Sequence, residues 1–179
     1  VSGGLESLTL EDYRRQFETN VFGLLRTVKA ALPELARSRG RLALIGSVAG
    51  YVSTPLASAY GMSKFAVRAL AQSLRHELKA LGVTVTHIAP GFIESEFRLK
   101  DARGQMRPDA KENVPAWLLV QARVAARQIV RAIRRRRREA VISRHGQALV
   151  LLARHTPWLL DLMLSSGPSW RRRDLAERA

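Results

Sequence analysis

Cysteine is absent from this chain of 179 residues. Its absence excludes disulfide bonds, thiolate zinc sites and cysteine nucleophiles. It is also typical of a cytoplasmic protein, which is the location we expect. Long apolar runs are missing as well: no stretch of about 20 uninterrupted apolar residues exists, so we expect no transmembrane span. The opening residues, VSGGLESLTLEDYRR, contain no basic segment followed by an apolar one, so no secretory signal is visible.

Acidic residues are scarce relative to basic ones. The chain has 15 Asp and Glu against 30 Lys and Arg, for a net charge of +15. Two arginine runs, Arg134 to Arg138 and Arg171 to Arg173, supply eight of these charges and leave +7 for the rest. The excess therefore lies largely in the last third, where it can report on a partner rather than on the fold. The hydrophobic content of 46% is ordinary for a globular domain.

Helical and strand patterns alternate along the chain. Apolar residues at helical spacing predict a helix over 9–36, with a capping box at Thr9 and Asp12 and a kink or end near Pro33. Segment 92–115 has mixed charge and two prolines, and we expect a long loop there. The remaining patterns predict helices over 58–81 and 117–136 and strands over 41–45, 83–88 and 140–143. This order predicts an α/β fold with a parallel sheet.

Ser47, Tyr60 and Lys64 lie in a stretch rich in small residues, SVAGYVSTPLASAYGMSK. Tyr60 and Lys64 are four residues apart in an expected helix, so they share one face. A tyrosine ordinarily titrates near pH 10, and an ammonium group within about 4–6 Å lowers its pKa. Ser47 follows an expected strand, at the carboxyl edge where α/β proteins hold ligands. The three side chains together can exchange a proton and orient a carbonyl oxygen.

The segments IGSVAG and SAYGMSK resemble the short-chain dehydrogenase/reductase family, in which serine, tyrosine and lysine have the spacing of Ser47, Tyr60 and Lys64. The segment NVFG resembles the family's asparagine motif and places that residue at Asn20. APGFIES resembles the family's Pro-Gly segment beside the nicotinamide. The resemblance covers about residues 1–143. It implies part of a Rossmann-like, doubly wound parallel sheet, the C-terminal half, followed by a helical tail.

The resemblance also implies an oxidoreductase that uses NAD or NADP to interconvert an alcohol and a carbonyl, and we expect a lipophilic substrate. Tyr60 would be the general acid and base, Lys64 would tune it, and Ser47 would polarise the substrate oxygen. Asn20 would hold a water that links the lysine to solvent. Family members are commonly dimers or tetramers, so a homo-oligomer is expected. The residues expected to contact the cofactor are Tyr60, Lys64, Pro90, Gly91, Ile93 and Ser95.

One family landmark has no counterpart here. The family begins with a strand and a T-G-x-x-x-G-x-G turn that seats the pyrophosphate, and no such pattern occurs in this chain. We therefore expect a truncated chain that lacks half of the sheet, exposes one edge of strand 41–45, binds the cofactor weakly and is poorly active alone. The alternative is a product that binds no dinucleotide. On the first interpretation, residues 1–145 form the catalytic half and residues 146–179 a helical, basic tail.

Two segments in the last third of the chain each allow two interpretations of their function. Arg134 to Arg138 form either a solvated helix end or a phosphate-binding patch for nucleic acid or anionic lipid; the lack of interleaved aromatics makes nucleic acid the weaker partner. The leucine-rich segment 146–164 is either a helix over the pocket or at a subunit interface, or a peripheral membrane contact. The second function class is thus a non-enzymatic basic module. The four histidines lack metal-ligand spacing: His76, His87, His145 and His155.

Overall fold

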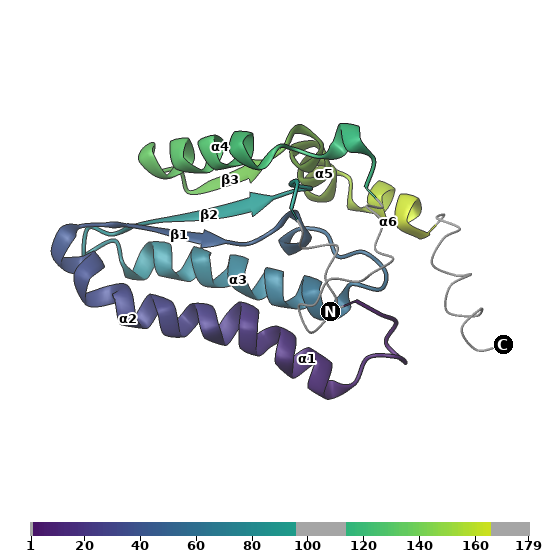
Figure 1. Ribbon diagram of the computed structural model, residues 1–179, viewed down its shortest axis with the longest axis horizontal. Helices are drawn as coiled ribbons and strands as arrows, with labels where there is room; N and C mark the ends of the chain where they lie inside the picture. Colours follow the sequence, from purple (N-terminus) through teal and green to yellow (C-terminus); the bar gives the residue numbers. More distant parts are fainter. Residues whose placement is uncertain (1, 96–113, 166–179) are drawn as a thin grey trace.

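The computed structural model describes residues 2–95 and 114–165. Three parallel strands, β1 (Arg41–Ile45), β2 (Thr84–Pro90) and β3 (Glu139–Ile142), form a sheet in that order (Figure 1). The register pairs Ile45 with Ile88 and Pro90 with Ile142. The carboxyl ends of all three strands therefore lie along one edge. The predicted α/β fold with a parallel sheet is confirmed.

The long N-terminal helix consists of α1 (Leu10–Phe17), a π-helical turn (Glu18–Phe22) and α2 (Gly23–Ser38). The predicted capping box is present: the Thr9 hydroxyl accepts a hydrogen bond from the Asp12 amide at 3.2 Å, and the Asp12 carboxylate accepts one from the Thr9 amide at 2.9 Å. The helix does not end at Pro33 but continues to Ser38. The apolar spacing predicted the extent of the helix but did not show the π-helical turn.

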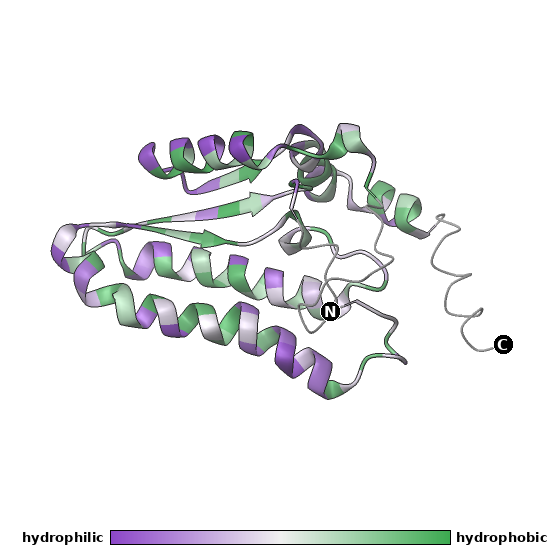
Figure 2. Ribbon diagram, in the orientation of Figure 1, coloured by the Kyte–Doolittle hydropathy of each residue, from purple (hydrophilic) through white to green (hydrophobic). Residues whose placement is uncertain are grey.

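Helices cover both faces of the sheet. α3 (Ser58–Glu77) and α2 pack on one face, whereas α4 (Ala122–Arg134) packs on the other. Figure 2 shows that α4 is hydrophilic along much of its length. The first core cluster contains Val28, Leu44, Val67, Ala71, Leu78, Val83 and Val85, and the second contains Ile88, Ala125, Ala132, Ala140 and Ile142. Because α3 and α4 connect successive parallel strands on opposite faces, the two crossovers have opposite hands, although right-handed crossovers are the rule.

Several predicted boundaries need correction. α3 ends at Glu77 rather than near residue 81, and the chain then turns through Gly82, whose φ is 72°. β2 continues past its expected end at residue 88 and includes Pro90. The single helix expected over 117–136 is a 3₁₀ turn (Ala116–Leu118) followed by α4. Residues 96–113 of the expected loop lie outside the described residues; beside them, Ile93 pairs with Val120 in an isolated bridge.

The tail begins with two helices, α5 (Arg144–His155) and α6 (Pro157–Ser165). Pro157 starts α6, a position where its missing N–H costs no helical hydrogen bond. Both helices pack against the short 3₁₀ helix after β1 (Val48–Gly50) through a third core cluster: Val48, Tyr51, Val52, Ala89, Val150 and Leu160. Within residues 2–95 and 114–165, every helix is too short or too polar to cross a bilayer. Arg171 to Arg173 lie outside the described residues.

The outer edge of β1 has no strand beside it in the described part of the chain. Ile45, at the carboxyl end of β1, is 47% exposed. An open strand edge presents unpaired backbone groups. This arrangement agrees with the expectation of an uncovered edge at strand 41–45.

Candidate active site

Ser47 and Tyr60 meet at the carboxyl edge of the sheet. Ser47 follows β1 and caps the 3₁₀ helix, with its hydroxyl accepting a hydrogen bond from the Ala49 amide at 3.1 Å. The same side chain lies near Tyr60, in the first turn of α3, where hydrogen bonding from Ser47 acts to lower the pKa of the tyrosine. Two hydroxyl groups from different elements are thereby held together beside the end of β1. The structure thus brings together the serine and tyrosine singled out by their spacing.

Lys64 lies one turn after Tyr60 on α3. Its ammonium nitrogen is 5.6 Å from the centroid of the Tyr60 ring and donates a long hydrogen bond, 3.4 Å, to the Ile45 carbonyl. Burial disfavours the charged form of each group, so it raises the pKa of Tyr60 and lowers the pKa of Lys64. The hydrogen bond with Ser47 opposes the rise at Tyr60. The prediction that Lys64 holds the tyrosine pKa below its usual value is therefore wrong for this geometry, since burial is the larger effect.

Asn20 reaches α3 through a buried serine that the sequence analysis did not single out. Asn20 belongs to the π-helical turn, and its amide nitrogen donates to the Ser63 hydroxyl at 2.9 Å. Ser63 in turn donates to the Tyr60 carbonyl at 2.7 Å and is 0% exposed. π-helical turns are frequent at functional sites. Ser63 could have been found from the sequence. It is a hydroxyl residue three positions after Tyr60, on the face of α3 that turns toward the preceding helix.

The loop after β2 is attached to the end of β3. Gly91 donates its amide to the Ile142 carbonyl at 3.0 Å, and the Phe92 amide donates to the His145 ring at 3.3 Å. A Cβ atom at Gly91 would lie 2.4 Å from the Ser143 hydroxyl oxygen, so any larger residue would have to displace the Ser143 side chain. Pro90 ends β2, Ile93 is half-buried and Ser95 is exposed. The four residues expected to contact a cofactor here thus lie at, or within five residues after, the end of β2.

Gly46, immediately before Ser47, is required by a buried histidine. A Cβ atom at Gly46 would lie 2.1 Å from Nε2 of His87. His87 is 1% exposed, and its Nδ1 lies 3.2 Å from the Tyr51 hydroxyl. Burial lowers the pKa of His87 to about 4. His87 is therefore a neutral core histidine near pH 7. Within residues 2–95 and 114–165, no group of three or more potential metal ligands lies together.

A sequence profile described as short chain dehydrogenase matches residues 1–105. The chain belongs to the short-chain dehydrogenase family. The match includes every residue proposed for catalysis or cofactor contact. Similar curated proteins include an uncharacterized oxidoreductase of Schizosaccharomyces pombe, 35% identical over 102 residues, covering 56% of this chain and 43% of that protein. D-beta-hydroxybutyrate dehydrogenase, mitochondrial, of Rattus norvegicus is 39% identical over 89 residues, covering 50% of this chain and 26% of that protein.

This member of the short-chain dehydrogenase family spans less than half the length of those curated relatives. Among solved structures, it is similar to a short chain dehydrogenase of Burkholderia cenocepacia in complex with NADP, with a TM-score of 0.78 and 23% identity over 91% of this chain and 65% of that one. A short-chain dehydrogenase of Sphingobium yanoikuyae in complex with NADPH has a TM-score of 0.67 and 24% identity, over 94% and 62% of the two chains. These likenesses confirm the Rossmann-like fold.

Proposed function

We propose that this chain carries the proton-transfer half of an NAD- or NADP-dependent oxidoreductase that interconverts an alcohol and a carbonyl. The observation that supports the proposal is that Ser47, Tyr60 and Lys64 lie together at the carboxyl edge of the sheet, with the Lys64 ammonium nitrogen 5.6 Å from the centroid of the Tyr60 ring. Family membership and the NADP and NADPH complexes of the structural relatives point to the same chemistry.

The side chains present fit a nicotinamide cofactor. An ammonium group has three hydrogen-bond donors, and within the described residues Lys64 uses only the long bond to the Ile45 carbonyl. The remaining donors suit the ribose hydroxyls. Gly91 and the neighbouring residues Pro90, Ile93 and Ser95 would line the nicotinamide side at the carboxyl end of β2. The bound cofactor would supply or accept the hydride.

Tyr60 would give its proton to the substrate oxygen during reduction. Because burial raises its pKa above the usual value, the phenol is protonated at neutral pH and ready to donate. Ser47 would direct a hydroxyl at the same oxygen and stabilise charge that develops there. Asn20 and Ser63 would act on Tyr60 through its backbone, since their hydrogen bonds end at the Tyr60 carbonyl. The water relay that family resemblance assigns to Asn20 stays a prediction.

The direct test removes the Tyr60 hydroxyl. Tyr60→Phe, in the protein expressed from its complete reading frame, should lower kcat for ketone reduction by about 10²–10⁴-fold, because that factor is typical of a positioned acid or base. The matched control is Tyr13→Phe, which loses a hydroxyl bonded to Ser58 at 2.6 Å and should keep near-normal turnover. Turnover by Tyr60→Phe equal to that of the control would contradict the proposed function.

Other parts of the proposal concern surfaces and partners. We propose that the tail shapes a pocket for a lipophilic substrate and touches a membrane peripherally, because α5 and α6 expose Leu151, Trp158 and Met163 by 60%, 67% and 60%. The division into residues 1–145 and 146–179, the homo-oligomer and the cytoplasmic location stay predictions. Sedimentation velocity of the purified chain checks the oligomer.

A further inference from the structure

α4 presents a row of arginines to solvent. Arg123, Arg127 and Arg131 follow one another at four-residue steps, and Arg134 and Arg135 close the row. All five are exposed, and none forms an ion pair with a carboxylate in residues 2–95 or 114–165. No acidic residue occurs anywhere between Asn113 and Glu139. The charge on this face is therefore not neutralised by the described part of the chain itself.

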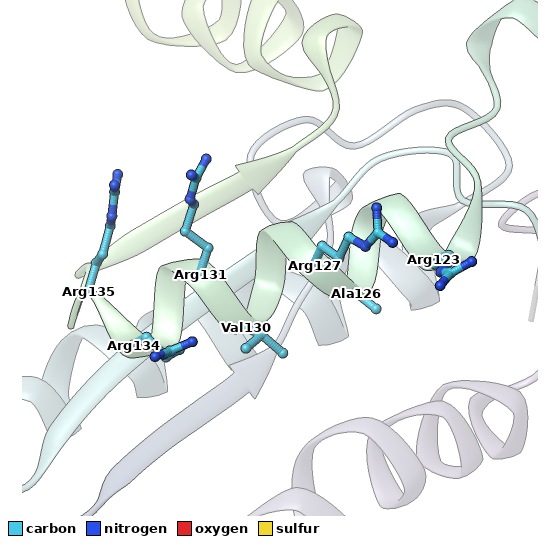
Figure 3. A pocket seen from close by; sticks show the side chains of 7 residues that line it. All are labelled: Arg123, Ala126, Arg127, Val130, Arg131, Arg134 and Arg135. Atoms are coloured by element: carbon cyan, nitrogen blue, oxygen red, sulfur yellow. The ribbon is translucent and has the colours of Figure 1, made fainter.

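The row lies on an open surface. A shallow hollow is lined by residues of α4 and of the turn after it: Arg123, Ala126, Arg127, Val130, Arg131, Arg134 and Arg135 (Figure 3). Because one helix supplies nearly all of the lining, the hollow cannot enclose a small molecule. α4 has 13 residues and so measures about 20 Å along its axis. An extended anionic surface fits such a face better than a single small anion does.

Aliphatic side chains lie among the arginines. Val130 is 53% exposed and Val124 is 39% exposed, whereas Ala125 and Ala132 turn inward onto the sheet. Figure 3 shows Arg131 and Arg135 extending on one side of α4 and Val130 with Arg134 on another. Cations beside exposed aliphatic groups match the boundary between phosphate headgroups and acyl chains. α4 has no aromatic residue on which nucleic-acid bases could stack, which favours lipid over single-stranded nucleic acid.

We propose that the outward face of α4 binds the surface of a membrane that contains anionic phospholipids. The phosphates would contact Arg123, Arg127, Arg131 and Arg134, and Val130 would reach toward the acyl chains. This face is on the opposite side of the sheet from α3, which carries Tyr60 and Lys64, so the proposal does not depend on the proposed oxidoreductase activity. It is also separate from the contact proposed for α5 and α6.

The test is flotation of the purified chain with vesicles of phosphatidylcholine alone or with 30 mol% phosphatidylserine. Arg127, Arg131 and Arg134 replaced together by Gln should lower partitioning onto the anionic vesicles about 100-fold at low salt. The matched control replaces Arg14, Arg26 and Lys29 by Gln, an equal charge change on the exposed surface of α1 and α2. It should lower partitioning by less than about 5-fold, since α1 and α2 lie on the far side of the molecule from α4 (Figure 1). Circular dichroism of both variants verifies the fold.

Each alternative gives a distinct result. Equal losses in the two triple variants would mean that net charge, not α4, determines binding, and would overturn the proposal. Equal binding to neutral vesicles would overturn it too. If Trp158→Ser abolishes binding while the α4 variant binds normally, the tail is the contact and the proposal fails. If the chain binds duplex DNA through the α4 arginines but does not bind vesicles, the partner of this face is nucleic acid and the lipid proposal fails.

Val130→Ser should weaken vesicle binding severalfold at high salt, which a purely electrostatic face would not show.

Discussion

Tyr60 shows how position in the fold changes the meaning of a sequence pattern. Four-residue spacing correctly places Lys64 on the same face of α3, yet the lysine lies over the ring, and burial raises the tyrosine pKa. Burial depends on how α3, β1 and the 3₁₀ helix pack, which spacing along one helix does not encode. The raised pKa keeps the phenol protonated through neutral pH.

Gly46 is a residue whose identity follows from its neighbour across the sheet. Gly46→Ala should destabilise the chain by about 3 kcal/mol, because the added methyl group overlaps the His87 ring in a packed core. Urea unfolding measures the loss. Gly23→Ala is the control: Gly23 is helical, and its added Cβ would lie 3.3 Å from the Glu18 carbonyl oxygen, so the change should be within about 1 kcal/mol.

A double-mutant cycle distinguishes this overlap from other effects of Gly46→Ala. His87→Ser removes the ring that the new methyl group would meet. In that background the cost of Gly46→Ala should fall below about 1 kcal/mol, because the two positions are in direct contact and their effects are not additive. An unchanged cost would contradict the assignment.

Among the elements, the helix before β1 is the one whose detail the sequence hides. Apolar spacing and the Thr9 capping box predict its start and extent, and both are observed. The π-helical turn inserts a backbone irregularity that shifts which side chains face α3, and no residue type marks it. It places Asn20 against Ser63, so the partner of Asn20 was missed although Asn20 itself was identified. The end expected near Pro33 is wrong, because packing against α3 on both sides of the proline keeps the helix continuous to Ser38. The kink near Pro33 stays a prediction.

Ser63→Ala tests whether this helix positions Tyr60. The substitution leaves the Asn20 amide without its partner and removes a hydrogen bond to the Tyr60 carbonyl, so we expect a loss of about 1–2 kcal/mol in stability. A positioning role further predicts a severalfold lower kcat with little change in KM for the carbonyl substrate. The control is Ser58→Ala, a change in the same helix as Ser63. It removes the hydroxyl that is hydrogen-bonded to Tyr13 of α1. An unchanged kcat in Ser63→Ala would leave Ser63 a structural residue only.

At the scale of the whole molecule, the order of elements was readable but their placement was not. Alternating helices and strands predict a parallel sheet, and short apolar strands such as RLALI predict burial. The helices α3 and α4 connect neighbouring strands in equivalent ways, yet they cover opposite faces. A one-dimensional pattern does not carry the hand of a crossover, and the usual rule would place both helices on one face. The arginine-bearing surface of α4 exists as a separate face only because of this arrangement.

The pH dependence of global stability follows from His87 in the central strand. Its pKa is about 4 in the folded chain, because burial and the cations Arg68, Arg75 and Lys64 outweigh the opposing carboxylate of Glu139. Between about pH 6.5 and 4 the unfolded chain binds a proton that the folded chain does not, so stability falls as the pH falls. The loss should reach about 3 kcal/mol at pH 4.

Urea unfolding from pH 7.5 to pH 4 measures this loss, with His87→Gln as the comparison. The variant retains a polar side chain but no titrating ring, so its stability should decline less over the same range. His145, whose pKa burial also lowers, remains in both proteins and contributes equally to each curve. Parallel curves for the two proteins would show that His87 binds its proton in the folded chain near its ordinary pKa. The central strand would then accommodate a buried imidazolium charge, contrary to the prediction.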